Sequence, residues 1–296
     1  MTKWTTADIP NQTGRTIIVT GANSGLGAAT AGALAAAGAR VILACRDVEK
    51  GKQAAATMSG DTEVRELDLA SLASVRAFTD SVDNVDVLIN NAGVMALPLR
   101  RTADGFEMQF GTNHLGHFAL TALLLDRISG RVVTVSSVAH RIGQLNLADP
   151  NFTNRRYDRW LAYGQSKLAN LMFAYELQRR LIGEGSAVLS VAAHPGYAAT
   201  DLMSHTESFQ DWVMSIGNRM GAAQTPAQGA LPTLFAATAE VEPGAFYGPD
   251  GFLGLAGYPG KSSSSAAARD TKAAAALWQL SDDLCAHALS DSHHIA

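Results

Sequence analysis

The chain contains 296 residues, of which 47% are hydrophobic and 17% are charged, and its formal net charge is −4. This length is sufficient for a large buried core, and the composition excludes a disordered, fibrous or strongly basic protein. A charge balance this close to neutral predicts no binding to nucleic acid or to anionic membranes. The two cysteines, Cys45 and Cys285, are too few for a disulfide framework or a zinc site.

Residues 16–39 carry no charge and would be numerous enough to span a membrane. They include five glycines and three threonines, so we expect no membrane span here. The start of the chain contains Asp8 and Pro10 and has no apolar signal core. We therefore expect a soluble, cytoplasmic protein.

Short β-branched runs alternate with longer Ala- and Leu-rich stretches from about residue 15 to residue 195. The predicted strands are 16–20, 40–45, 64–69, 85–90, 131–137 and 187–194. The predicted helices are 24–37, 71–82, 106–128 and 160–182. Short strands separated by helices imply βαβ units and a doubly wound parallel sheet with helices on both faces.

The alternation of predicted strands and helices weakens after residue 195 and then resumes. We expect a helix near 226–239, a short strand around 245–247 and a last helix from about 266 to 280. Gly-, Pro- and Ser-rich loops separate them, so residues 242–296 are predicted to be C-terminal loops and a helix. Because no linker is evident, residues 1–296 are predicted to form a single α/β domain with about seven strands.

A glycine-rich turn, TGANSGLG (20–27), follows the first predicted strand and opens the first helix. Gly21, Gly25 and Gly27 allow the backbone to approach a pyrophosphate, which the N–H groups of the helix N-terminus can bind. The spacing differs from the commoner G-x-G-x-x-G, and a tight turn without a ligand is the alternative. Its position between strand and helix favours a Rossmann-type, dinucleotide-binding domain.

Further motifs follow the turn in chain order. They are Asp68-Leu69, Asn90-Asn91-Ala92-Gly93, Asn113 within NHLGHF (113–118), Ser137 at the end of VSS, YGQSK (163–167), and His194-Pro195-Gly196 followed by Thr200. With these motifs the chain resembles the short-chain dehydrogenase/reductase family over nearly its whole length. The stretch YGQSKLANLMF (163–173) is most similar to the retinol-dehydrogenase-like branch. The resemblance implies an NAD(P)(H)-dependent oxidoreductase that transfers hydride between nicotinamide and a carbonyl/alcohol pair.

Tyr163 and Lys167 are the predicted catalytic pair. Residues i and i+4 share a helix face, so the ammonium group would lower the pKa of the phenol from about 10. Tyr163 would then exchange a proton with a carbonyl or alcohol oxygen. Ser137, at the end of a strand, would orient the same oxygen, whereas Ser136 should point to the opposite face. The alternative is a helical neighbour pair without chemistry.

The resemblance assigns additional roles. Lys167 would also hold the nicotinamide ribose, Asn113 would anchor a water that relays the proton, and Thr200 would contact the carboxamide. Asp68 and Leu69 resemble the pair that contacts adenine, although a strand end with a helix cap is the alternative. The complete predicted cofactor-binding set is Gly21, Asn23, Ser24, Gly25, Leu26, Gly27, Arg46, Asp68, Leu69, Asn91, Ala92, Gly93, Tyr163, Lys167, Pro195, Gly196 and Thr200.

The end of the second strand predicts which dinucleotide is preferred. NAD-binding relatives have an acidic residue there for the ribose 2′-hydroxyl, whereas this chain has Cys45 followed by Arg46. An arginine can pair with a 2′-phosphate, so we expect NADP(H) in preference to NAD(H). Asp47 and the absence of a basic residue at Asn23-Ser24 argue in the other direction.

Two further features concern the surroundings of the site. Ser137 and Tyr163 are 26 residues apart, about twice the separation common in the family. The additional segment, residues 141–160, is predicted to be a loop beside the active site, and retinol-dehydrogenase-like members have a similar extension. His114 and His117 have a spacing that metal ligands can use, but no third ligand is evident, and we predict no metal.

Residues 196–224 are predicted to form a mobile lid over the substrate. An apolar stripe at helical spacing consists of Phe209, Trp212, Val213, Ile216 and Met220. Such a lid would favour a lipophilic aldehyde, ketone or alcohol as substrate. The alternative is that the stripe packs into the core or into a subunit interface.

Two other functions are considered. A non-catalytic, dinucleotide-sensing regulator could use the same fold, but such proteins usually lack the Tyr/Lys pair. A sugar-nucleotide epimerase needs a larger C-terminal substrate region than the roughly 100 residues that follow residue 195. By resemblance alone, we expect a homodimer or homotetramer.

Overall fold

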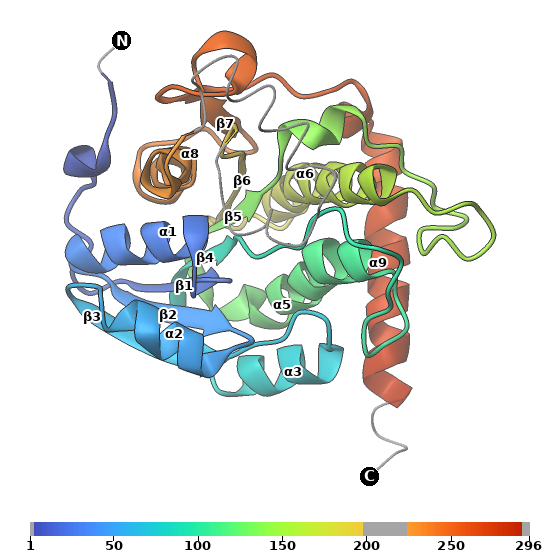
Figure 1. The fold of residues 1–296 in the computed structure, drawn as a ribbon, viewed down its shortest axis with the longest axis horizontal. Helices are drawn as coiled ribbons and strands as arrows, with labels where there is room; N and C mark the ends of the chain where they lie inside the picture. Colours follow the sequence, from blue (N-terminus) through green and yellow to red (C-terminus); the bar gives the residue numbers. More distant parts are fainter. Residues whose placement is uncertain (1–2, 198–223, 292–296) are drawn as a thin grey trace.

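In the computed structural model, which describes residues 3–197 and 224–291, a single sheet of eight strands forms the centre (Figure 1). The strands are β1 (Thr16–Thr20), β2 (Arg40–Cys45), β3 (Asp61–Glu66), β4 (Val85–Asn90), β5 (Ile128–Val135), β6 (Leu189–Ala193), β7 (Phe246–Pro249) and β8 (Pro259–Lys261). Their order is β3-β2-β1-β4-β5-β6-β7-β8, and β1 to β7 are parallel. The predicted doubly wound sheet is confirmed.

Helices cover both faces of the sheet (Figure 1). One face packs against α1 (Gly25–Ala36), α2 (Val48–Ala55) and α8 (Pro226–Thr238). The other face packs against α3 (Leu72–Asp80), α5 (Gly116–Leu124) and α6 (Arg159–Gly183), and α9 (Thr271–Asp291) crosses this layer on the outside. Within β1, Ile17 and Val19 pack on the side of α1 and α8, and Ile18 packs on the side of α5 and α6. Because β1 is buried on both faces, its sequence is an unbroken apolar run.

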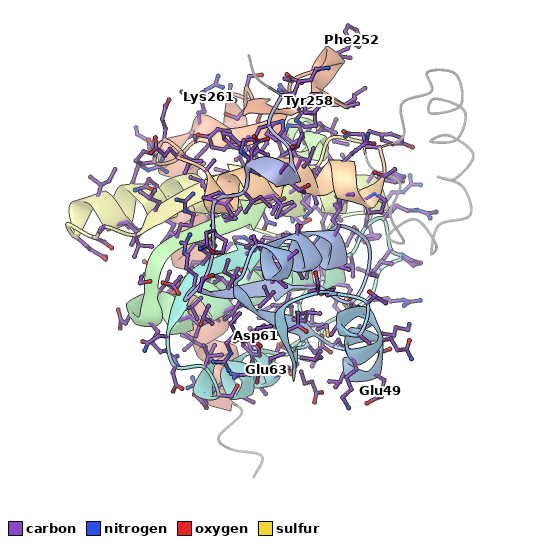
Figure 2. The ribbon with its side chains drawn as sticks, turned by 90° about the vertical axis from the view of Figure 1, so that its left-hand side faces the viewer. Glu49, Asp61, Glu63, Phe252, Tyr258 and Lys261 are labelled. Carbon is purple, nitrogen blue, oxygen red and sulfur yellow. The ribbon has the colours of Figure 1, made fainter. Side chains whose placement is uncertain are left out.

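The sheet has one strand more than the expected seven. β8 is short and antiparallel to β7, with Gly248 opposite Gly260. Short strands in Gly- and Pro-rich sequence give a weak periodicity, so this pairing was not predicted. The connection from β7 to β8 exposes Phe252, which is 75% exposed and projects from this end of the molecule near Tyr258 (Figure 2).

The predicted helix 106–128 is wrong as one element. It is divided into α4 (Met108–Phe110), a π-helical turn η2 (Gly111–Leu115), α5 and a 3-10 turn η3 (Leu125–Arg127). Inside the π-turn the side chain of Asn113 bonds to the backbone of Val94, which a periodic sequence pattern cannot indicate. π-turns of this kind are frequent at functional sites.

Other element boundaries also differ from the predictions. β3 was expected at 64–69, but Leu67 and Leu69 are buried in the turn before α3 and not in the strand. The α2 helix was not predicted, since it has only eight residues, and it begins where Asp47 accepts a hydrogen bond from the Lys50 amide. The last helix begins at Thr271 and not near 266, after the 3-10 turn η7 (Ala267–Arg269). Among the described residues, no helix is long and apolar enough to cross a membrane.

Candidate active site

The strand order reverses at β1, whose neighbours β2 and β4 are followed by helices on opposite faces. In doubly wound sheets, ligands bind in the crevice at the carboxyl ends of the strands at this switch point. The glycine turn, the Asn-Ala-Gly motif, Ser137 and the Tyr163/Lys167 pair lie on the segments that follow β1, β4 and β5 and on α6. The topology therefore brings motifs from four segments of the sequence to one edge of the sheet.

The glycine turn after β1 has the shape that the sequence predicts. Gly21 and Gly25 have φ values of 65° and 52°, in the left-handed region that glycine tolerates. A Cβ atom on Gly27 would overlap the carbonyl oxygen of Gly21 and lie 2.7 Å from Asn91 Nδ2. The turn is thus closed by backbone contacts that a larger residue would prevent.

The N-terminus of α1 opens directly from this turn. Ser24 is the N-cap, and within the described part of the chain its side chain makes no capping hydrogen bond. The first turn of α1 contains no acidic residue. A helix end with free N–H groups and no competing carboxylate fits the pyrophosphate of a dinucleotide.

β1 and β4 are joined where the crevice begins. Thr20 Oγ1 accepts hydrogen bonds from the backbone N–H groups of Asn91 and Ala92, both at 2.9 Å. Asn91 Nδ2 donates to the carbonyl of Thr20 at 2.8 Å. The next residue, Gly93, lies so close to Asn113 and Lys167 that a Cβ atom there would be 3.4 Å from Lys167 Nζ. The Asn-Ala-Gly motif therefore connects the glycine turn with α6.

Ser137, Tyr163 and Lys167 lie together at this edge. The side chain of Ser137 hydrogen-bonds to that of Tyr163. Lys167 Nζ lies 5.9 Å from the centre of the Tyr163 ring and donates to the carbonyl of Val135 at 3.1 Å. Tyr163 is 7% exposed and Lys167 is 4% exposed. These three predicted residues are thus in one cluster.

The expected direction of the Tyr163 pKa is wrong for this structure. Burial raises the pKa of Tyr163 to about 12, while the hydrogen bond from Ser137 acts in the opposite direction. Burial also lowers the pKa of Lys167 to about 8. Desolvation of the phenol therefore determines the direction of the shift, and the Lys167 ammonium, which lies beside the ring, donates instead to the Val135 carbonyl.

The expectation for Ser136 is also wrong. Its hydroxyl donates to the carbonyl of Lys167 at 2.7 Å, so Ser136 and Ser137 both contact α6. The alternation of side chains does not apply here, because β5 ends at Val135. The two serines differ in their partners: Ser136 bonds to the helix backbone, and only Ser137 bonds to the Tyr163 side chain.

Asn113 is fully buried and its side chain is bound on both sides. Its Oδ1 accepts from Val94 N at 2.7 Å, and its Nδ2 donates to Val94 O and to Ser166 Oγ, both at 2.9 Å. Ser166 Oγ in turn donates to the carbonyl of Tyr163 at 2.8 Å. Asn113 therefore connects the loop after β4 with the first turns of α6. That Asn113 anchors a proton-relaying water stays a prediction.

The region predicted for the adenosine half lies at the ends of β2 and β3. Arg46 is exposed directly after β2. The Asp47 carboxylate is engaged by the amide and the ammonium of Lys50, at 3.0 and 3.7 Å. Asp68 accepts from Ala70 N at 2.9 Å, and Leu69 is buried. Asp47 is therefore directed to its own helix.

The Pro195-Gly196 turn follows β6. Gly196 has φ of 70°, and its N–H donates to His194 Nδ1 at 3.2 Å. Gln224 Nε2 donates to the carbonyl of Pro195 at 3.1 Å. Thr200 and the predicted lid residues Phe209, Trp212, Val213, Ile216 and Met220 lie outside the described residues.

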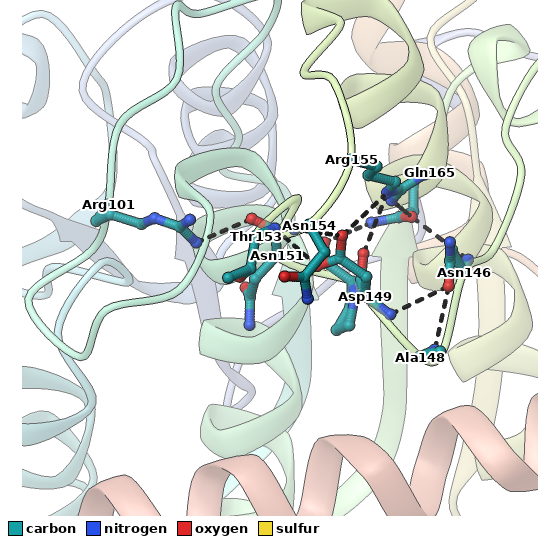
Figure 3. A network of polar contacts seen from close by, with 10 residues as sticks. Arg101, Asn146, Ala148, Asp149, Asn151, Thr153, Asn154, Arg155 and Gln165 are labelled. Carbon is teal, nitrogen blue, oxygen red and sulfur yellow. Dashed lines mark hydrogen bonds and ion pairs between the residues drawn. The ribbon is translucent and has the colours of Figure 1, made fainter.

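The extension before α6 is an ordered polar loop (Figure 3). Asp149 accepts from the amides of Thr153 and Asn154, and Arg155 Nε donates to the carbonyl of Asp149 at 3.2 Å. Gln165 on α6 accepts from Arg155 Nη2 at 2.7 Å and donates to Pro150 O at 2.9 Å. The extension is therefore anchored on α6 two residues from both Tyr163 and Lys167.

A sequence profile described as short chain dehydrogenase matches residues 15–211. The chain belongs to the short-chain dehydrogenase family. Family members bind nicotinamide dinucleotides, and NADP is present in some of the solved structures that resemble this chain. Membership supports an oxidoreductase that acts on CH–OH or C=O groups.

Relatives of this short-chain dehydrogenase include human retinol dehydrogenases. It is 41% identical to retinol dehydrogenase 12 over 293 residues, which cover 92% of this chain and 86% of the relative. It is 50% identical to retinol dehydrogenase 13 over 206 residues, 65% of this chain and 62% of the relative. An uncharacterized protein from Mycobacterium paratuberculosis, solved by crystallography, is 53% identical with a TM-score of 0.85, covering 96% and 98% of the two chains.

The site of this short-chain dehydrogenase contains polar residues to which the sequence analysis assigned no role in the site. They include Thr20, His117, Gln165 and Ser166, all fully buried or nearly so. All four lie within the recognised motifs, so the sequence showed the residue types but not the contacts that these side chains make. Asn113 and His117 are four residues apart, a spacing that could have indicated a helical contact between them.

Proposed function

We propose that this short-chain dehydrogenase prefers NADP(H) and interconverts a lipophilic aldehyde or ketone with its alcohol, with Tyr163 as general acid/base. The observation that supports it best is the buried cluster in which Ser137 hydrogen-bonds to Tyr163 and Lys167 lies beside the ring. A bound nicotinamide supplies or receives the hydride. The retinol dehydrogenase relatives support the lipophilic substrate and give no support to a non-catalytic regulator.

The chain's own residues would handle the proton. Tyr163 donates its phenolic proton to the carbonyl oxygen during reduction and recovers it in the reverse direction. Ser137 donates a hydrogen bond that stabilises negative charge on the phenolate, since it opposes the burial-induced rise of the Tyr163 pKa. Lys167, with a pKa of about 8, is largely protonated at pH 7 and places its charge next to that phenolate.

NADPH oxidation with a series of linear aldehydes tests this function. Tyr163→Phe removes the proton donor and should lower kcat by about 10²–10⁴-fold while leaving the Kd for NADPH nearly unchanged. Tyr175→Phe is the matched control, because it removes a phenol from the same helix, where Tyr175 bonds to Ser264. Near wild-type kcat in Tyr163→Phe would refute the assignment.

The aldehyde series also tests the substrate class. A lipophilic pocket predicts that kcat/KM rises with chain length, by up to about 0.8 kcal/mol for each methylene. A flat series, or a preference for sugars, would reject the lipophilic substrate without affecting the role of Tyr163. Separate titrations with NADPH and NADH test the cofactor preference, which tighter binding of NADH would contradict.

We also propose a homodimer or homotetramer, on the basis of the family resemblance. Light scattering at micromolar concentration would contradict this assembly if it returned the mass of one chain.

A further inference from the structure

His117 lies on α5 between two parts of the site that are far apart in the sequence. Its side chain is 1% exposed. His117 Nε2 lies 2.9 Å from Thr20 Oγ1, at the end of β1. His117 Nδ1 lies 2.9 Å from the carbonyl oxygen of Asn113, in the π-turn. The imidazole therefore bridges the glycine turn and the residue that contacts α6.

The hydrogen-bond partners determine the tautomer of this ring. A carbonyl oxygen can only accept, so the proton must be on Nδ1, facing Asn113. Nε2 is then an acceptor for the hydroxyl of Thr20. That hydroxyl oxygen already accepts the N–H groups of Asn91 and Ala92, so its own proton is available for donation.

The alternative acceptor for the Thr20 hydroxyl is the carbonyl of Ile89, at 3.3 Å. His117 Nε2 is closer, at 2.9 Å, and completes an unbroken series of donors and acceptors. A neutral ring is also what burial favours, since it lowers the pKa of His117 to about 4. Each ring nitrogen of His117 thus has one defined partner and one defined direction of donation.

The bridge continues to the backbone of Tyr163. Asn113, whose carbonyl is held by His117, donates through Nδ2 to Ser166 Oγ at 2.9 Å. Ser166 donates to the carbonyl of Tyr163 at 2.8 Å. One imidazole therefore stands between the Asn91–Ala92 backbone and the helix that positions the catalytic tyrosine.

We propose that His117 is a positioning residue with two separable functions. Through Nε2 it fixes Thr20 and the Asn91–Ala92 backbone, and so acts on dinucleotide affinity. Through Nδ1 it fixes the Asn113 carbonyl, and so acts on the geometry of Tyr163 and on kcat. The kcat effect rests on the proposed function of Tyr163, whereas the affinity effect does not.

The two functions can be separated because amides imitate one ring nitrogen at a time. In His117→Asn the side-chain amide reaches the Nδ1 position and can donate to the Asn113 carbonyl, but it cannot reach Thr20. In His117→Gln the amide oxygen reaches the Nε2 position and can accept from Thr20, but the Asn113 carbonyl loses its donor. His117→Phe retains the ring and loses both contacts.

The experiment measures the Kd for NADPH by fluorescence titration and kcat at saturating NADPH with the best aldehyde. His117→Asn should raise Kd by about 5- to 50-fold and change kcat less than about threefold. His117→Gln should lower kcat by about 5- to 50-fold and change Kd less than about threefold. His117→Phe should show both effects.

His114→Phe is the matched control. His114 is equally buried, three residues earlier in the chain, but its side chain contacts Ser281 Oγ on α9 at 2.8 Å and Asn170 on α6, and neither Thr20 nor the Asn113 carbonyl. We expect a lower Tm with unchanged Kd and kcat. Equal changes in Kd and kcat for the Asn and Gln variants, or the same changes in His114→Phe, would overturn the proposal.

The proposal stays testable if one variant does not fold or if no aldehyde is reduced. If His117→Phe does not fold, the Asn and Gln variants still separate the two effects. If the wild-type protein reduces no aldehyde, the proposed function fails, but the order of Kd values still tests the Thr20 contact. An unchanged Kd in His117→Asn would overturn that half of the proposal regardless of activity.

Discussion

The turn between β1 and α1 and the first turns of α6 face the same crevice, but different forces shape them. The turn is formed by backbone, and its geometry depends on residues that lack a side chain, Gly21, Gly25 and Gly27. The start of α6 is formed by buried polar side chains, since Gln165, Ser166 and Lys167 are each buried and hydrogen-bonded. The glycine turn therefore depends on the absence of Cβ atoms, and the start of α6 depends on side-chain hydrogen bonds.

This difference predicts different responses to mutation. A glycine that is required for lack of space has no conservative replacement, because every other residue places a Cβ atom at the same position. A hydrogen-bond requirement can be met partly by another side chain with a donor or acceptor in the right position. Even the smallest substitution in the turn should therefore weaken NADPH binding strongly, whereas substitutions near α6 should have graded effects that another polar side chain can partly rescue.

The largest effect on NADPH binding is expected at the turn. Gly27→Ala places a methyl group against the Gly21 carbonyl and Asn91, and should raise the Kd for NADPH by about 10- to 100-fold. Gly32→Ala is the control in the same helix, where a Cβ atom meets nothing closer than Met58 Cγ at 3.5 Å. Normal NADPH binding by Gly27→Ala would show that the turn does not depend on a missing Cβ atom.

The next effect concerns the extension. Gln165→Leu removes the bonds from Arg155 Nη2 and to the carbonyl of Pro150 and should reduce the free energy of unfolding by about 1–3 kcal/mol. Hydrogen exchange should accelerate in residues 142–158. Gln178→Leu, which removes a bond to the Ser190 amide from the same helix, should accelerate exchange at β6 instead. Unchanged exchange in residues 142–158 would show that Gln165 does not anchor them.

A smaller effect is expected at the end of β2, where a charge is exposed. Arg46→Ala should weaken NADPH binding by about five- to tenfold and leave NADH binding nearly unchanged, because only NADPH has a 2′-phosphate. Lys50→Ala removes an equal charge from α2, four residues later in the chain, and serves as control. Equal losses for the two dinucleotides would remove Arg46 from the proposed site.

The smallest effect lies outside both regions, at the edge strand β3 (Figure 2). Glu63 contacts Arg65 Nε at 2.6 Å and Arg40 Nη2 at 2.8 Å, and the bond from Arg65 contributes most to the lowered pKa of the Glu63 carboxyl. Its side chain is 36% exposed, so Glu63→Gln should reduce the free energy of unfolding by less than about 1 kcal/mol at pH 7.

The sign of the pH dependence follows from the lowered pKa. The carboxylate stabilises the folded state above its unfolded pKa of about 4.3, and this contribution is lost as the pH falls through the folded value. Thermal unfolding of wild type and Glu63→Gln should therefore differ at pH 7 and converge on acidification. A difference that grew on acidification would contradict the assigned sign.

The sequence predicted best what depends on local pattern. β1, β2 and β4 begin and end where the apolar runs do, because burial on both faces removes any ambiguity in these strands. The glycine turn was also predictable, since its shape needs a missing Cβ at fixed spacing. The motifs around Tyr163 were identified by resemblance, and their chemical roles stay predictions.

What the sequence did not predict depends on contacts between distant residues. The His117–Thr20 bond joins positions 97 residues apart, and the Gln109–Tyr157 bond joins positions 48 apart. In the π-turn Asn113 bonds to Val94, a contact that no periodicity encodes. The pKa of Tyr163 was predicted in the wrong direction, because burial of the phenol is a property of the packed structure.

The central position of β1 has a consequence for the order of folding during synthesis. β1 pairs on one side with β2, which follows soon after it, and on the other side with β4, where Ile17 meets Val87. Pairings between distant segments form slowly, because a long loop must first be closed. Until Val85 has left the ribosome, one edge of β1 lacks its partner and offers a template for aggregation. The strand that creates the crevice thus depends in the nascent chain on residues synthesised much later.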